Sequence, residues 1–231
     1  MAFTVTLSEL RDRVREFTDT VNSLTPTNAQ LDVQINRSVR SLYARICEGG
    51  AEFLTTSTTV TTAAGVGTYD LPADFWRLRS VVWRRGTRDV VPLSRFEQRD
   101  RAELESEPWS GRARYRLADV AFNGGTPTIE FCPPPDRTCT MFIAYVPDPP
   151  TLEDENQEAG TPAVPLVCTP GMDEWIALDV TCRVLATEET DVTSWAQLRG
   201  DVWTNEIVPS LGLRDEHRTN PNSDHDADEV W

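Results

Sequence analysis

Hydrophobic periodicity changes twice along this sequence, and the two changes divide the chain into three parts. Residues 1–50 repeat apolar side chains at spacings of three and four, which is typical of amphipathic helices. From Phe53 onward, β-branched residues punctuated by glycine and proline replace that pattern up to about residue 150. Helical spacing then returns over residues 171–210. The sequence therefore predicts an α+β chain in which a β domain is inserted between two helical segments.

The first helical segment, residues 1–50, contains two helix starts. Thr6 with Glu9, and Thr27 with Gln30, have the spacing of a capping box, in which the two side chains satisfy each other's backbone N–H groups. Gly49 and the glycine after it end the second helix. We expect an antiparallel helical hairpin whose apolar stripe needs further partners.

The inserted β domain, residues 51–150, opens with a strand, a proline turn and a second strand. The turn is rich in aromatic residues, which anchor a chain reversal to a core. We expect short strands arranged as an antiparallel β-sandwich or a barrel-like domain, with a charged helix near residues 95–107. The residues of the turn, which either pack in the core or face a partner, are Tyr69, Leu71, Pro72, Phe75 and Trp76.

The β domain also holds clustered arginines, and all 22 basic residues of the chain are arginine. Three of the cluster alternate with apolar residues, which places their guanidinium groups on one face of a strand. This face is either solvated or paired with an acidic surface on a neighbouring subunit, because the arginine fork suits carboxylates. The candidate inter-subunit arginines are Arg84, Arg85, Arg112, Arg114 and Arg116.

The last third of the sequence returns to helices and then loses its apolar residues. Residues 151–170 read as a proline-rich linker, and residues 171–210 as a second helical hairpin with an apolar stripe that includes Leu198. Stacking the two hairpins covers both apolar stripes, so we expect a four-helix bundle. Residues 211–231 cannot bury enough surface to fold alone, so we expect an extended acidic tail.

The negative charge is concentrated in the same third. Residues 1–150 hold 18 arginines against 19 acidic residues, whereas residues 151–231 hold 4 against 18. A solvated acidic face is the ordinary explanation; the alternatives are a basic partner or repulsion of an anionic one. A DNA-binding surface is not expected there, because phosphate neutralisation needs cations.

The acidic tail ends in an aromatic residue, which favours docking on a partner. A tryptophan after an acidic run resembles an anchor that fills a pocket while the acids steer it. The candidate docking residues are Arg214, Asp215, Glu216, Arg218, Asp224, Asp226, Asp228, Glu229, Val230 and Trp231.

The sequence lacks the residue patterns of common enzymes. Its two histidines, His217 and His225, both fall in the tail, where no packed surroundings would fix a metal, so we predict no metal and no cofactor. No lysine is present, which excludes a P-loop and a Schiff base. Cys132 and Cys139 flank a turn and would face each other across a hairpin, but a cytosol-like compartment disfavours a disulfide. We predict that the chain is not an enzyme.

Targeting signals are also missing from the sequence. No run of eighteen apolar residues exists, and the N-terminus lacks a basic region followed by an apolar one. We therefore expect no membrane association and a cytosol-like compartment.

Four stretches of the chain resemble the bacteriophage head-to-tail adaptor family, which includes the tail tubular protein A of short-tailed phages. They are the second helix, LDVQINRSVRSLYARI; the strand–turn–strand TYDLPADFWRLRSVV; the hairpin TIEFCPPPDRTCTMFIAYVPDPPTL; and the returning helix, MDEWIALDVTCRVLATEETD. Together they cover most of residues 1–209.

The resemblance implies a structural protein of the virion neck, assembled in the host cytoplasm. Adaptors of this family form a dodecameric ring under the portal protein, extend the DNA channel and present a surface to the tail tube or nozzle. It implies partners in the portal, the tail and further copies of the chain, with DNA passing through unbound. The turn around Pro72 would then face the tail side if it does not pack in the core.

Two other functions remain open from the residues. A carbohydrate-binding or glycan-processing module of a phage tail would use Trp76, Trp83 and Trp109 as a platform for sugars. A tail-terminator ring would occupy a different position in the same neck.

Overall fold

The computed structural model describes residues 3–18, 26–50, 54–85, 89–105, 114–118, 126–154, 166–187 and 191–212. Contacts divide the chain into two compact units. Unit 1 consists of residues 1–52 and 149–231, and unit 2 consists of residues 53–148. The mixture of helices and sheets confirms the predicted α+β class, while the finer division into hairpins, linker and tail stays a prediction.

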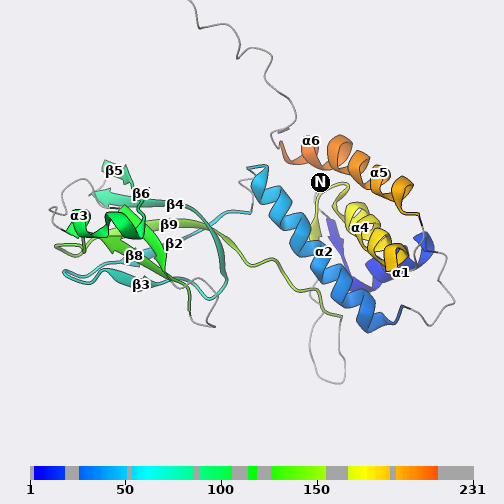
Figure 1. The fold of residues 1–231 in the computed structure, drawn as a ribbon, viewed down its shortest axis with the longest axis horizontal. Coiled ribbons are helices and arrows are strands. Elements are labelled where there is room, and N and C mark those ends of the chain that lie inside the picture. The colour runs from blue at the N-terminus through cyan, green and yellow to red at the C-terminus, as the bar shows by residue number, and fades with distance from the viewer. Residues whose placement is uncertain are drawn as a thin grey trace, which may run out of the picture. The chain divides into compact units, whose positions relative to one another are not determined.

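Unit 1 is built around one central helix, α4 (Met172–Thr187), which contacts α1 (Leu7–Phe17), α2 (Asn28–Glu48) and α5 (Thr193–Val202). In Figure 1, α4 lies between α2 and α5. Most of its side chains are buried around the whole circumference, as expected of a helix that is apolar on every side. The helices thus gather on α4, and a closed four-helix bundle stays a prediction.

Both predicted capping boxes are present and fix the starts of α1 and α2. The Thr6 N–H donates to the Glu9 carboxylate at 2.8 Å, and the Glu9 N–H donates to Thr6 Oγ1 at 3.3 Å. Thr27 and Gln30 exchange the same pair of hydrogen bonds at 2.9 and 3.3 Å. These contacts satisfy N–H groups that a helix start leaves without partners.

Unit 1 also contains a two-stranded ribbon that the sequence analysis missed. Strand β1 (Phe3–Val5) pairs antiparallel with β10 (Leu166–Cys168). Three residues each are too short to show a strand periodicity, and the partners lie far apart in sequence. The ribbon places Val5 and Leu166 in the core of the unit.

The last helical segment differs from the prediction in two respects. It does not continue as a regular α-helix, because the wide π turn η2 (Trp203–Ile207) follows α5 and leads into a final helical turn, α6 (Val208–Leu211). Pro209 stands near the start of that turn, where a proline is tolerated. Leu198, expected on the buried stripe, is 42% exposed, whereas Val202 is buried.

Unit 2 contains two four-stranded sheets that share one apolar core. The first has the order β2 (Thr56–Thr61), β9 (Thr140–Pro147), β4 (Phe75–Arg85), β5 (Asp89–Pro92). The second has the order β3 (Thr68–Asp70), β8 (Thr128–Cys132), β7 (Arg114–Ala118), β6 (Ser94–Arg95). Core residues come from both sheets, including Trp83, Ile129, Phe131, Met141 and Ile143.

The sheets of unit 2 correct two details of the prediction. Within the described residues they do not close into a barrel. They are not wholly antiparallel either, because β6 runs parallel to β7. Where a longer charged helix was expected, a 3-10 turn, η1 (Gln98–Asp100), and a short helix, α3 (Arg101–Glu105), follow β6.

The cysteines are free thiols in this structure. Cys132 and Cys139, which flank the turn between β8 and β9, are not bonded to each other. Cys132 instead packs with Phe96 and Leu104, and Cys139 lies 2.9 Å from the Thr62 hydroxyl.

Candidate functional site

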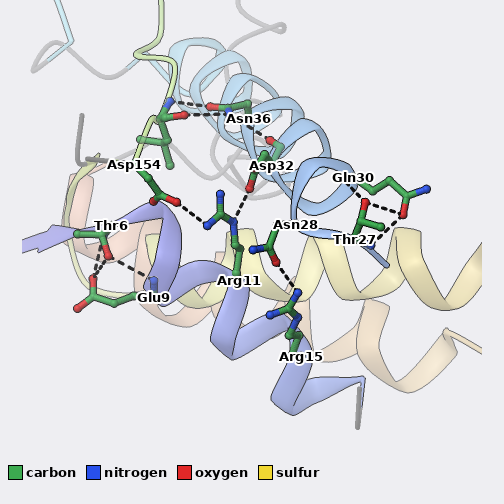
Figure 2. Close-up of polar contacts among 11 residues, drawn as sticks. Thr6, Glu9, Arg11, Arg15, Thr27, Asn28, Gln30, Asp32, Asn36 and Asp154 are labelled. Carbon is green, nitrogen blue, oxygen red and sulfur yellow. Dashed lines mark hydrogen bonds and ion pairs between the residues drawn. The ribbon is translucent and has the colours of Figure 1, made fainter. Parts of the chain in front are cut away.

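The most connected polar site lies in unit 1, where Arg11 joins three segments of the chain (Figure 2). Its guanidinium donates to Asp32 on α2 and to Asp154 on the chain that returns from the β insert, each at 2.5 Å. Arg11 is largely buried. These hydrogen bonds, above all the one donated to Asp32, raise the pKa of Arg11 above its ordinary value. We call Arg11, Asp32, Asn36, Leu152 and Asp154 the linker clamp.

Asn36 completes the linker clamp, because its side-chain amide pairs with both backbone polar groups of Leu152. Its Oδ1 accepts from the Leu152 N–H at 2.7 Å, and its Nδ2 donates to the Leu152 carbonyl at 3.2 Å. The same Nδ2 donates to the Asp32 carbonyl on the preceding turn of α2. Figure 2 shows Asn36 directed from α2 toward the returning chain.

The linker clamp holds the return segment, by which we mean residues 149–154 of the chain that comes back from the β insert. The sequence predicts a linker running over the surface, but Leu152 is only 2% exposed and both of its backbone polar groups are paired. The start of the return segment is therefore fastened to α1 and α2. Neither Arg11 nor Asn36 was singled out from the sequence, because their partners lie far away along the chain.

Two further ion pairs tie α4 to its neighbours. Arg13 on α1 pairs with the buried Asp173 in the first turn of α4, where a carboxylate also suits the helix dipole. Asp179, 3% exposed, accepts from Arg183 at 2.9 Å and from Arg199 on α5. Burying a carboxylate costs free energy, and ion pairs with two arginines offset that cost.

Aromatic and cationic side chains stack where α2, α4 and η2 meet. The Arg45 guanidinium lies 4.0 Å from the centre of the Trp203 ring, and Trp203 meets Trp175 edge to face. Arg199 lies over the Trp175 ring. This stack contributes cation–π attraction and rigid packing.

The candidate inter-subunit arginines of unit 2 differ in their partners and in their exposure. Arg116 donates twice to Glu130, at 2.7 and 3.1 Å, and Arg101 of α3 pairs with the other oxygen of Glu130. Arg84 lies over the Phe142 ring and is exposed, and Arg114 is half-buried. The side chain of Arg85 and all of Arg112 lie outside the described residues. The inter-subunit role stays a prediction for the set.

The strand–turn–strand residues lie mainly in the core of unit 2. Leu71 and Phe75 are buried, and Phe75 stacks on Tyr145. The Tyr69 hydroxyl accepts from the Ala63 N–H and donates to the Val66 carbonyl, which fixes the preceding turn.

The other two residues of this turn, Pro72 and Trp76, are half-buried. Trp83 is 3% exposed within the core, so it cannot belong to a sugar-binding platform. Trp109 lies outside the described residues.

The predicted docking tail, residues 214–231, lies outside the described residues, including both histidines. Within the part of the chain that the structure describes, no group of histidine, cysteine or acidic side chains is arranged to hold a metal ion. No helix among the described residues is long and apolar enough to cross a bilayer. What the described polar sites do is join segments of the fold.

Comparison with known proteins identifies a family. The family model described as SU10 adaptor protein matches residues 5–201, which span both units and all of the linker clamp. Among curated proteins, none matches the chain significantly in sequence.

Proposed function

We propose a role in the virion neck for this chain, which belongs to the SU10 adaptor protein family, a family of bacteriophage head-to-tail adaptors. The resemblance found in the sequence is thereby confirmed, and the chain is a phage adaptor that works with other head and tail proteins. In our proposal, its copies form a dodecameric ring between the portal and the tail tube or nozzle, assembled in the host cytoplasm, and extend the DNA channel.

The observation that carries the proposal is the match to the adaptor family over residues 5–201. The partly buried polar side chains of the linker clamp support a structural role, because they hold segments of the chain together. The linker clamp fastens the chain returning from unit 2 to two helices of unit 1.

Charge supports the proposed channel. Unit 1 holds 10 arginines against 25 acidic residues, whereas unit 2 holds 12 of each. An acidic wall repels the DNA backbone, so DNA slides past without specific binding. We assign the channel-lining surface to unit 1.

The acidic tail and the β unit provide the proposed docking surfaces. The tail, residues 211–231, would become ordered on the portal with Trp231 as its anchor. Unit 2 would face the tail tube or nozzle. Arg84 and Arg114, with Arg85 and Arg112, would meet carboxylates of the neighbouring copy, whereas Arg116 is engaged by Glu130 of its own unit.

Mixing the purified protein with its portal protein tests the proposal. We expect rings attached to the portal by negative-stain electron microscopy. Absence of a complex at micromolar concentrations of both proteins would overturn the adaptor role for this portal. A variant that lacks residues 214–231 should fail to attach, and attachment unchanged by that deletion would refute tail docking alone.

A further inference from the structure

The outer face of α2 carries a line of exposed residues opposite its buried stripe. Val33 is 65% exposed, and Arg37 and Arg40 are exposed as well. Together with the half-buried Ala44 they follow the spacing i, i+4, i+7, i+11, which is one straight line on a helix. Arginine is enriched at protein interfaces, and an exposed apolar side chain beside such groups gives this face both an apolar and a charged element for a contact.

The two arginines of this line have no acidic partner among the described residues of unit 1. Other described arginines of the unit are engaged: Arg11 and Arg13 pair with carboxylates, and Arg45 lies on Trp203. The side chains of Arg37 and Arg40 make no ion pair with the described residues. They form a basic band on a unit that carries an excess of 15 acidic residues over arginines.

A complementary line occurs on α5. Leu198 is 42% exposed, and Ser194, Asp201 and Asn205 are exposed at the same spacing on α5 and η2. Asp201 makes no ion pair with the described residues. The arginine of α5, Arg199, is engaged by the buried Asp179, so within the described part of the unit no cation on α5 compensates the charge of Asp201.

The two lines belong to different sides of unit 1. Helix α4 contacts both α2 and α5 and lies between them (Figure 1), so the outward faces of α2 and α5 do not meet within one unit. Two different and complementary patches on one subunit make a heterologous contact. Repetition of such a contact closes into a ring when the rotation between copies allows it.

We propose that the outer face of α2 docks on α5 of a neighbouring copy, with Val33 against Leu198 and with Arg37 and Arg40 opposite Asp201. This inference rests on the proposed ring and assigns the contact between its subunits. Helix α1 offers another acidic face, with Asp12 and Glu16 exposed, but no large apolar side chain is exposed there. The charge and the apolar contact together favour α5.

Cysteine cross-linking tests the pairing. A chain with Val33→Cys and Leu198→Cys, assembled on the portal and oxidised, should give a ladder of covalent multimers on a non-reducing gel. All variants also carry Cys139→Ser, because Cys139 is half-buried, whereas the native Cys47, Cys132, Cys168 and Cys182 are buried. In this background Val33→Cys alone should give no ladder. A ladder from Val33→Cys with Asp12→Cys, and none from the first pair, would move the contact to α1 and overturn the inference.

Charge reversal tests the electrostatic part. Arg37→Glu with Arg40→Glu should weaken self-association at least about tenfold, and adding Asp201→Arg should restore most of the loss. Arg137→Glu, an exposed reversal in unit 2, is the matched control and should leave assembly unchanged. Rings that form normally with the reversed arginines would refute this contact while the adaptor role stands. Wild-type protein that forms no ring with the portal would refute the adaptor role itself.

Discussion

Single side chains in this protein join segments that are distant in sequence, and Arg11 is the fullest example. Its two hydrogen bonds reach residues 21 and 143 positions away. Asp179 does the same for α4 and α5, and Glu130 for β8, β7 and α3. In each case, removing the shared residue leaves charged groups without partners, which costs more than a surface ion pair contributes.

Ionisation of Glu9, which caps α1, makes the stability of the fold depend on pH. Hydrogen bonds from Thr6 lower the pKa of Glu9 below the ordinary glutamate value of about 4.5. A lowered pKa in the folded state means that the ionised group stabilises the fold above about pH 4.5, and that this contribution disappears as the pH falls through the folded pKa. Glu9→Gln should therefore flatten the acid limb of the stability profile, measured by urea unfolding between pH 3 and 7. Equal profiles for the two proteins would contradict the capping role of the carboxylate.

Glu130 should matter more than an exposed acid of the same unit. Glu130→Ala leaves Arg116 and Arg101 without their shared carboxylate, so we expect a loss of about 1–3 kcal/mol in the free energy of unfolding. Asp136→Ala removes an exposed carboxylate and should change it by less than about 0.5 kcal/mol. Chemical denaturation followed by tryptophan fluorescence compares the two. Similar losses of unfolding free energy in the two variants would show that the ion pairs of Glu130 do not stabilise unit 2 more than an exposed carboxylate does.

Among the secondary-structure elements, the attachment of the return segment to α2 can be tested directly. Asn36→Leu removes both hydrogen bonds to the backbone of Leu152, so we expect the Leu152 N–H to exchange with solvent at least tenfold faster. Glu48→Gln, an exposed change on the same helix, is the control and should leave that exchange unchanged. Hydrogen–deuterium exchange of residues 149–154 measures both. Unchanged exchange in Asn36→Leu would mean that the linker clamp does not hold the segment.

The elements also show what the sequence could reveal. Both helix starts were predictable, because a capping box joins residues only three apart, such as Thr6 and Glu9. The β1–β10 ribbon was not, since Val5 and Leu166 pair across most of the chain without a local signal. The exposure of Leu198 escaped prediction because periodicity places a residue on a face but does not say what covers that face. Arg11 and Asn36 escaped it because their polar partners come from distant segments.

At the scale of the whole molecule, the two units differ in composition. Unit 1 carries the entire excess of acidic residues, and unit 2 is neutral. Unit 1 offers complementary helix faces on α2 and α5, whereas unit 2 offers arginine-bearing strands around its sandwich core. In our account, unit 1 builds the ring and its channel, and unit 2 meets the tail.

A cryo-electron microscopy reconstruction of the virion neck would show whether this protein forms the proposed ring. We expect a ring of this protein directly below the portal, with α2 of each copy against α5 of the next and with acidic helices toward the DNA. A neck fully explained by other proteins, with this chain found in a fibre or outside the virion, would contradict it.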